Sequence, residues 1–409
     1  MGTQVKSGSA GANKLQNVAL FTAATQAPTW LNMMTGGAPT EVKGKPGQKQ
    51  TEPGAPIVRV TNLEKTAGDE VTMDIFHNLT GTPTMGDRKL EGRGESMSQA
   101  HFDLKIDQGR HLVDAGGKMS QKRTQHNLRA TSRKLLSGWY GRLKDEVTQV
   151  HLMGARGDFS NENTILPMED HTEFGEIMVN PVTPPTYNRH MYGGDATALD
   201  NLDAADLMSL SVVDNLRLFL DESGSPLQPL QFEADEQRLH DPMWGYYITP
   251  RQWFDLQEST SMKDWQKMTA DAMKRSQGFN HPLFKGECAM WNGILIKKMN
   301  RTTRFTAGRP VNVCTNTKNA AVTQIAPGVT VERSLLLGAQ ALGHAWGRAG
   351  KKDAGGHHFS MTEEPADHGN STETVIAWMD GMGKIRFKNK DGYITDHGSM
   401  VVDTAVSGL

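Results

Sequence analysis

Cysteine, net charge and long apolar runs are all scarce in this chain of 409 residues. Its two cysteines, Cys288 and Cys314, cannot build a disulfide framework, so nothing indicates an oxidising compartment. Lys and Arg total 44 against 46 Asp and Glu, and the formal charge of −2 excludes a general polyanion binder, which would carry a clear basic excess. Hydrophobic residues make up 37%, but 42 glycines bring the apolar share near the roughly 45–50% of globular proteins.

Membrane and leader segments are not indicated either. No stretch approaches the roughly 18 apolar residues that a membrane-spanning helix needs. The longest apolar segment, Ser334–Trp346, is interrupted by Gln340 and His344, and we predict that it is part of a buried helix. A signal-like run at 15–27 contains several polar residues, so we expect a cytosolic product and no membrane partner.

Motifs typical of enzymes are missing. The phosphate loop GxxxxGK[ST], the nucleophile elbow GxSxG and the zinc helix HExxH do not occur. The best candidate metal ligands are His344, His357, His358 and His368, but their spacing is looser than the tight pairs of a structural zinc site. We favour a solvated loop there, and predict no catalytic, cofactor-binding or metal-binding residue.

The length predicts two or three domains at about 150 residues each, and no internal repeat indicates a solenoid or propeller. Residues 1–56 are rich in Gly, Ala, Thr, Lys and Pro, with isolated large apolar groups. These groups are too few for a core and too many for a solubilising tail. The segment is either a disordered leader or an arm that docks on another surface.

Two strands with a charged loop between them follow the arm. Apolar residues alternate with polar ones in Glu70–Phe76 and in His101–Asp107, as in strands with one buried face. The intervening loop at 80–98 is long and charged, and such loops are usually functional or disordered. The pattern predicts a protruding β-ribbon. Because a lone two-stranded ribbon is marginal in water, we expect another subunit to cover its apolar face.

A long helix is predicted from Ser120, as N-cap, to Gly154, a length of roughly 50 Å. One side of it is basic, with only Asp145 and Glu146 as acidic residues. The basic residues are Lys122, Arg123, Arg129, Arg133, Lys134, Arg142 and Lys144. Such a stripe could neutralise nucleic-acid phosphates. We favour the alternative that it pairs with carboxylates on another element.

The rest of the chain mixes helices and strands, so the predicted fold class is α+β. The predicted elements are a helix at 204–220, a strand running into a helix at 246–257, a helix at 259–276, a strand at 293–299, a strand followed by an apolar helix at 328–348, and strands at 374–379, 384–388 and 399–406.

The order of these elements resembles the Hong Kong 97-type fold of tailed-phage major capsid proteins, and most closely the capsid family of enquatrovirus-like (N-four type) podoviruses. The segment Gly68–Glu95 carries much of the resemblance, with a G-x-P-x-x-G-D turn and an L-E-G-x-x-E ending. Further matching segments are Tyr247–Leu256, Pro282–Glu287, Gly293–Ile296, Val331–Gly347 and Asp391–Val406.

The resemblance implies five parts of the chain. They are an N-terminal arm at 1–56, an extended β-hairpin called the E-loop at 57–117, a peripheral domain at 118–240 with a spine helix at about 120–153, an axial domain at 241–375, and return strands of the peripheral domain at 376–409. At the E-loop tip the expected intersubunit contacts are Arg88, Lys89, Glu91, Arg93 and Glu95. The expected docking residues of the arm are Leu20, Phe21, Trp30 and Leu31.

The implied function is that of a major capsid protein, which is no enzyme. It would self-assemble as hexamers and pentamers into the icosahedral head of a tailed double-stranded DNA phage, in the host bacterial cytoplasm, and remain in the virion. The implied partners are the portal protein and possible decoration or scaffolding proteins. The packaged DNA would lie close to the shell without specific binding. The alternatives are a nucleic-acid-binding protein that uses the basic stripe and a metal-dependent hydrolase built on the four histidines.

Overall fold

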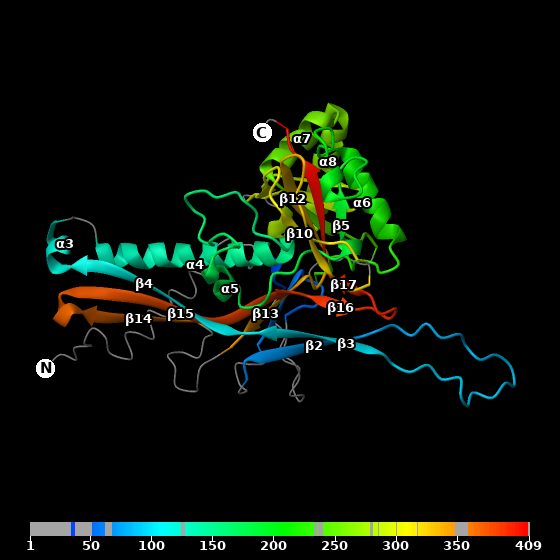
Figure 1. Cartoon of the computed structure of the whole chain (residues 1–409), viewed down its shortest axis with the longest axis horizontal. Coiled ribbons are helices and arrows are strands. Elements are labelled where there is room, and N and C mark those ends of the chain that lie inside the picture. Colours follow the sequence, from blue (N-terminus) through cyan, green and yellow to red (C-terminus); the bar gives the residue numbers. More distant parts are fainter. Residues whose placement is uncertain are drawn as a thin grey trace.

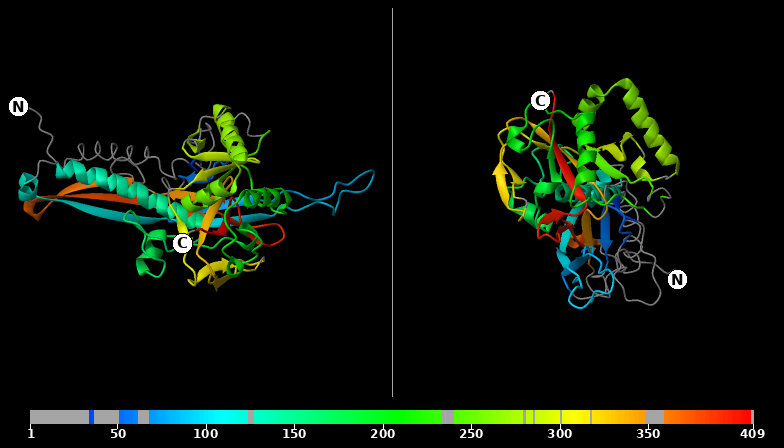
Figure 2. Two further views of the ribbon diagram at one scale, coloured as in Figure 1. Left: turned by 90° about the horizontal axis from the view of Figure 1, so that it is seen from above. Right: turned by 90° about the vertical axis from the view of Figure 1, so that its right-hand side faces the viewer.

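The computed structural model describes residues 34–36, 51–61, 68–123, 127–232, 235, 240–278, 281–284, 286–299, 301–316, 318–347 and 359–407. The molecule has an elongated layer and a compact body above one part of it (Figure 1). Seen from above, the elongated layer extends well beyond the compact body on both sides (Figure 2). Within the described residues, no helix has the length and apolar character to cross a membrane.

The elongated layer is built on a five-stranded sheet. Its members are β1 (Ile57–Val60), β13 (Leu342–Trp346), β15 (Ser371–Lys384), β14 (Phe359–Ala366) and β4 (Asp107–Gly117). The long strand β15 pairs antiparallel with β13, β14 and β4, so it is the central strand of the layer. β1 pairs parallel with β13 at the end nearest the compact body.

Helix α4 (Leu128–Met153) lies along this sheet and is the predicted spine helix. Leu136 and Tyr140 pack against Met361 and Ile376 of the sheet. The predicted start of the helix is wrong. A separate short helix, α3 (Lys118–Arg123), precedes α4, whose N-cap is Asn127, with its side chain accepting the Ala130 N–H at 3.1 Å.

The compact body contains a seven-stranded mixed sheet. Its members are β5 (His190–Tyr192), β18 (Ser399–Ala405), β12 (Val331–Leu337), β6 (Trp244–Ile248), β8 (Ile294–Lys298) and β7 (Cys288–Trp291) in this order, and β9 (Thr303–Phe305), which pairs with β12. Alternate residues face two cores. Tyr246 and Leu336 pack with the helices above the sheet, whereas Tyr247 and Leu335 share a core with α4.

Three helices cover the outer face of this sheet. They are α6 (Leu210–Glu222), α7 (Pro250–Ser259) and α8 (Met262–Gly278). α7 begins with a capping box between Thr249 and Gln252 and a proline in its first turn. The remaining elements are α5 (Thr172–Met178), the hairpins β10 (Val311–Cys314)–β11 (Val322–Ile325) and β16 (Arg386–Lys388)–β17 (Ile394–Asp396), and 3₁₀ helices at Tyr187–Arg189, Leu199–Asn201, Pro282–Phe284 and Asp367–Gly369.

The prediction of an apolar helix after the strand in 328–348 is wrong, and so is the prediction that Ser334–Trp346 is part of a buried helix. The segment forms two strands, β12 and β13, which lie in different sheets and are joined by a turn where Gln340 has a φ of 56°. Every residue of β12 is buried, because both faces of its sheet are covered. A strand buried on both faces has no alternating pattern, so its apolar run looks like part of a helix.

The sheets also cross the predicted domain boundaries. β13 and β14 lie inside the range 241–375 but pair in the sheet of β4 and β15. β18 lies in the range 376–409 but pairs with β12 in the compact body. The chain therefore passes between the two sheets at residues 338–341, and again between β15 and β18.

Candidate intersubunit surface

The predicted β-ribbon is present. β2 (Glu70–Phe76) and β3 (Gln99–Lys105) pair antiparallel, with Met73 opposite Phe102, in agreement with the alternation in the sequence. Residues 77–98 between them form no helix or strand. This segment, which we call the E-loop tip, projects away from the rest of the molecule in both views (Figures 1 and 2).

The apolar face of the ribbon strands is covered by the chain itself. Val71 and Leu104 pack with Val58 of β1 and Ala345 of β13. Ala100 packs with Phe387 of β16 and its neighbour Ile385. The expectation that a second subunit covers this face is therefore wrong for the strands, because β1, β13 and β16 of the same chain pack against them.

The E-loop tip and the strand end that leads into it expose large apolar side chains. The exposed fractions are 61% for Phe76, 64% for Leu79, 71% for Met85, 70% for Leu90 and 76% for Met97. An exposed apolar group set in a projecting loop is typical of an interaction surface.

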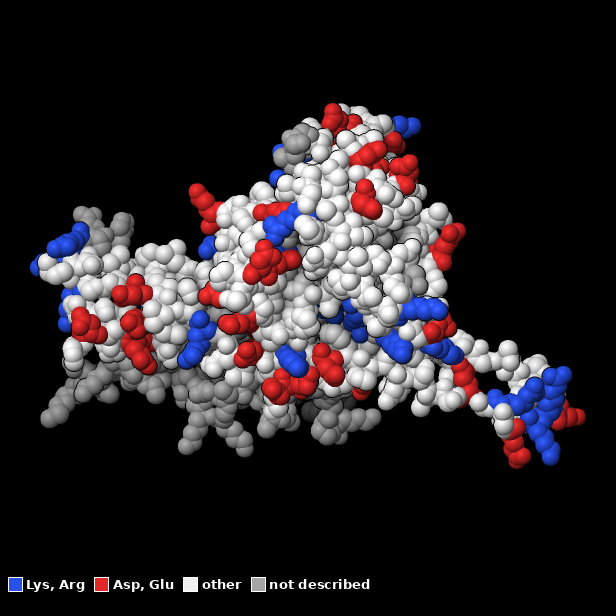
Figure 3. Space-filling view, in the orientation of Figure 1, with Lys and Arg blue, Asp and Glu red and all other residues white. Residues whose placement is uncertain are grey.

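Charged side chains accompany these apolar groups. Arg88, Lys89, Glu91 and Arg93 are all exposed on the E-loop tip. A cluster of mostly basic side chains is visible at the far end of the loop (Figure 3). The four predicted contact residues thus lie together on one projecting segment, and whether they contact another subunit stays a prediction.

Glu95, the fifth predicted contact residue, connects the two ends of the E-loop tip to each other and to Lys390 of the same chain. Its carboxylate accepts the backbone N–H groups of Thr80 at 3.0 Å and Gly81 at 2.5 Å, and lies 2.6 Å from Nζ of Lys390. The ammonium of Lys390 also bonds to the hydroxyl of Thr80. Hydrogen bonds from Lys390, Thr80 and Gly81 lower the pKa of Glu95 to about 2, so the carboxylate stays ionised.

Lys390 was not predicted as a site residue. It lies between β16 and β17, where Asn389 and Gly392 form a tight turn: the Gly392 N–H bonds to the Asn389 carbonyl at 3.0 Å. The Asp391-Gly392 pair could have indicated this turn from the sequence. Nothing in the sequence indicates that the turn contacts Glu95, almost 300 residues earlier.

The predicted arm residues Leu20, Phe21, Trp30 and Leu31 lie outside the described residues. Of the arm, Met34 is fully buried in the core of its own chain, where its Sδ accepts a hydrogen bond from the hydroxyl of Tyr247 at 3.3 Å. The neighbouring Thr35 forms a parallel bridge with Ile57 of β1.

Three of the seven basic residues of the predicted stripe, all on α4, pair with carboxylates of the five-stranded sheet, as we favoured. Nε of Arg129 lies 2.7 Å from Glu363, and Nε of Arg133 lies 2.5 Å from the same carboxylate on β14. The ammonium of Lys144 lies 2.6 Å from Asp380 on β15 and is buried. These contacts neutralise the charges of Arg129, Arg133 and Lys144 within the chain, and weaken the nucleic-acid hypothesis.

The four candidate histidines do not form a described metal site. His344 is buried between Asp380, at 3.0 Å, and Trp346, whereas His368 is on an exposed turn. His357 and His358 lie outside the described residues. Among the residues that the structure does describe, no group of His, Cys, Asp and Glu could hold a metal ion.

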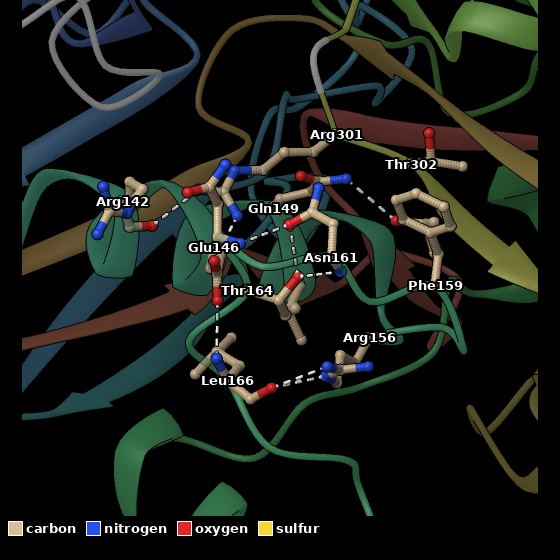
Figure 4. A pocket seen from close by; sticks show the side chains of 13 residues that line it. Arg142, Glu146, Gln149, Arg156, Phe159, Asn161, Thr164, Leu166, Arg301 and Thr302 are labelled. Atoms are coloured by element: carbon tan, nitrogen blue, oxygen red, sulfur yellow. Dashed lines mark hydrogen bonds and ion pairs between the residues drawn. The ribbon is translucent and has the colours of Figure 1, made fainter. Parts of the chain in front are cut away.

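A polar cavity of about 230 Å³ lies between α4 and the chain that follows it (Figure 4). Its charged groups bind one another. Glu146 accepts the N–H groups of Ile165 and Leu166 and pairs with Arg301 at 2.5 Å, and Arg156 donates two hydrogen bonds to the Leu166 carbonyl. This network fixes the loop after α4, which accounts for its charges without a ligand.

Comparisons with known proteins agree on one group. The sequence model of the family described as phage capsid protein matches residues 4–408. The chain is 23% identical over 369 residues to the major capsid protein of Pseudomonas phage KPP25, covering 87% of this chain and 89% of that relative.

Solved structures are similar over nearly the whole chain. The capsid of Ralstonia phage GP4 has a TM-score of 0.71 at 28% identity, covering 91% of this chain and 94% of its own. The capsid of Cyanophage Pam1 has a TM-score of 0.59 at 16% identity, covering 88% and 90%, and shares the fold.

Proposed function

Since the chain belongs to the phage capsid protein family, we propose that the E-loop tip is a surface through which each copy joins its neighbours. The chain has the Hong Kong 97-type fold and is the major capsid protein of a tailed phage, which forms the icosahedral head. The family is a structural one, and we propose no catalytic role for any residue of this chain.

The exposed apolar groups of the E-loop tip carry this proposal. Leaving Met85, Leu90 and Met97 about three-quarters exposed in an isolated chain is unfavourable, because burial contributes roughly 25 cal/mol per Å² of apolar surface. The cost disappears when another copy covers the tip. Each such contact can be modest, because closing a lattice makes later contacts effectively intramolecular.

The proposal also covers how the copies group and which other proteins they contact. Copies would group as hexamers and pentamers, together with a portal and with decoration or scaffolding proteins, during assembly in the host cytoplasm. Contact with packaged DNA would be non-specific, which a formal charge of −2 favours because the shell must enclose DNA without binding it tightly.

The observed sheets support revised domain boundaries. We propose that the peripheral domain comprises α4 and the five-stranded sheet, including β13 and β14, and that the axial domain comprises the seven-stranded sheet with its three covering helices. The E-loop is then the ribbon β2–β3 alone, and the arm remains residues 1–56.

Deleting Thr82–Ser98 tests the proposed role of the tip. Residues 77–81 would still connect β2 to β3 as a short hairpin loop, so the subunit should fold. We expect a soluble chain with a wild-type circular dichroism spectrum and no closed particles in negative-stain micrographs. A matched variant replaces the same residues by a Gly/Ser linker of equal length, and should also fail to assemble. Normal particles from either variant would overturn the proposal.

A further inference from the structure

The ribbon β2–β3 leaves the five-stranded sheet at one short junction. β3 ends at Lys105 and β4 begins at Asp107, so only Ile106 separates a strand of the ribbon from a strand of the sheet. From this point β4 runs beside β15, starting with the pair of Asp107 and Asp380. The conformation of the junction therefore sets the direction of the whole ribbon.

The sheet offers only backbone where β3 crosses it. A Cβ atom added at Gly381 of β15 would overlap the carbonyl oxygen of Lys105, and one added at Gly383 would lie 2.8 Å from Cδ1 of Leu104. The two glycines allow the close approach of β3, but they have no side chain that could fix the crossing angle. Because apolar contact is non-directional, the angle depends on hydrogen bonds, which have a defined geometry.

The side chain of Asn180 supplies such hydrogen bonds. Its Oδ1 accepts the backbone N–H of Lys105 at 3.0 Å, and its Nδ2 donates to the carbonyls of Lys105 at 2.9 Å and of Met382 on β15 at 3.0 Å. An amide side chain both accepts and donates, so it bonds to a strand as a peptide group of a neighbouring strand would. Asn180 is buried and connects β3 to β15, which form no ladder with each other in the described part of the chain.

The backbone immediately before Asn180 is strained. Val179 has a φ of 62° and a ψ of −59°, and it is the one β-branched residue with a positive φ among those that the structure describes. The Asn180 N–H bonds to the Met178 carbonyl at 2.6 Å, which closes a γ-turn with a positive central φ. This rare conformation persists only where the surrounding structure holds it.

The γ-turn is held from both sides. On one side, Phe174 and Met178 anchor α5 in the core that it shares with α4. On the other side, Asn180 is bonded to Lys105 and is followed by Pro181, which disfavours a helical conformation of the residue before it. Helix α5 therefore ends at Met178, and the γ-turn directs the Asn180 side chain to the junction.

We propose that Asn180 is a positioning residue, which fixes the direction in which the ribbon leaves the five-stranded sheet. Its three hydrogen bonds hold Val179 in the strained conformation. The inference goes beyond the proposed role of the E-loop tip, because it concerns the unassembled subunit and does not depend on what the tip contacts. Normal particles from the Thr82–Ser98 deletion would overturn the role of the tip and leave this inference standing.

A distance measurement tests the positioning role. Spin labels are attached at His101→Cys on the ribbon and at Lys134→Cys on α4, both exposed positions, in a chain that also carries Cys288→Ala and Cys314→Ala. Double electron–electron resonance on unassembled subunits gives the distribution of distances between the labels. Asn180→Ala should broaden this distribution at least about twofold, because the apolar contacts that remain do not fix the crossing angle. An unchanged distribution would overturn the proposal.

Asn188→Ala is the matched control. The Asn188 side chain donates to the hydroxyl of Thr395 on β17 at 3.0 Å, a contact in which no residue of the ribbon takes part. Its loss should lower the urea midpoint and leave the width of the distance distribution unchanged. Equal broadening by the two variants would show that any loss of stability moves the ribbon, which would also overturn the proposal.

A double-mutant cycle tests the connection between the strain and the hydrogen bonds. Val179→Gly removes the steric conflict of a positive φ, and should lower the unfolding equilibrium constant by about threefold to tenfold in a chain that keeps Asn180. In a chain with Asn180→Ala the turn is free to relax, so the same substitution should change the constant by less than about twofold. Urea denaturation of the unassembled chains gives the constants. Equal effects in the two chains would show that Asn180 does not hold the strained turn, and would overturn that part of the inference.

Discussion

Lys144 connects the spine helix to the five-stranded sheet through buried charges. Its ammonium lies 2.6 Å from Asp380, and the ring of His344 on β13 lies 3.0 Å from the other oxygen of that carboxylate. Burial alone would raise the pKa of Asp380, but Lys144 and His344 hold it well below its ordinary value. The carboxylate is therefore ionised and depends on both partners.

Replacing Lys144 by Met should destabilise the subunit by about 3 kcal/mol, because it leaves the Asp380 carboxylate with one partner in a buried site. Urea denaturation of unassembled subunits measures the change. Lys134→Met, on the exposed face of the same helix, is the matched control and should change stability by less than about 0.5 kcal/mol. Equal midpoints for the two variants would contradict a stabilising role of the buried pair.

Buried and half-buried histidines make the subunit sensitive to mild acid. Burial lowers the pKa of His151, His344 and His397 from 6.5 to about 4 in each case. Between these values the unfolded chain binds more protons than the folded chain. The free energy of unfolding should therefore fall as the pH drops from about 6.5 to about 4, and should be unaffected by these groups above that window.

His151→Gln tests this acid sensitivity. Glutamine can keep the hydrogen bond to the Met178 carbonyl, which His151 makes at 3.3 Å, but cannot take up a proton. The stability lost between about pH 7 and about pH 4 should shrink by on the order of 3 kcal/mol, at about 1.4 kcal/mol per pKa unit. The exposed His171→Gln should keep the wild-type profile. Parallel profiles for both variants and wild type would refute this account.

At the scale of the elements, the hairpin β16–β17 fixes the direction in which the E-loop tip leaves the ribbon. The hairpin presents Lys390 to Glu95, and its own base is held by Asp396, which pairs with Arg386 at 2.8 Å and Lys384 at 3.0 Å. The ion pairs of Asp396 are thus connected, through the hairpin, to the base of the E-loop tip. A loop held in one direction loses less conformational entropy on docking than a free one.

Lys390→Met removes the contact with Glu95, so the E-loop tip should no longer be held in one direction. Assembly should then slow by a factor of roughly 3 to 10, measured by light scattering at a fixed subunit concentration. Folding should be unaffected, because the pair is exposed. Lys390→Arg keeps the charge and should assemble near the wild-type rate, and Lys388→Met, on the same hairpin and exposed, serves as the control. Wild-type kinetics for Lys390→Met would show that the contact does not position the tip.

The same elements show how far the sequence alone could reach. The ribbon strands could be predicted because Val71 is buried and its neighbour Thr72 is exposed, so one face is marked by alternation. β12 could not, because Leu335, Leu336 and Leu337 are all buried and leave no period to detect. The existence of helix α4 could be predicted from its apolar spacing. Its start could not, because Ser120 and Asn127 are both residue types that favour the N-cap position.

The candidate intersubunit surface divides in the same way. The E-loop tip is one continuous segment, so its charges and its length mark it in the sequence. The contact at its base joins Glu95 to Lys390, and only the fold brings these two residues together. No local pattern could indicate this contact, because almost 300 residues lie between them.

At the scale of the whole molecule, each copy carries one projecting tip (Figure 1). Under the proposed role of the tip, a lattice grows only while every member carries one. A copy without the tip can be joined by the tip of a neighbour but cannot join the next copy. Such copies should therefore stop the growth of any assembly that contains them.

Mixing the Thr82–Ser98 deletion with wild-type chains tests this directly. At a fixed concentration of wild-type chains, the yield of closed particles should fall as the proportion of deletion chains rises, because deletion chains occupy places in the lattice and cannot join the next copy. Negative-stain micrographs count the particles, and an equal mass of serum albumin in place of the deletion chain is the control. An unchanged yield, or normal particles that contain deletion chains, would contradict this account of how the tip joins copies.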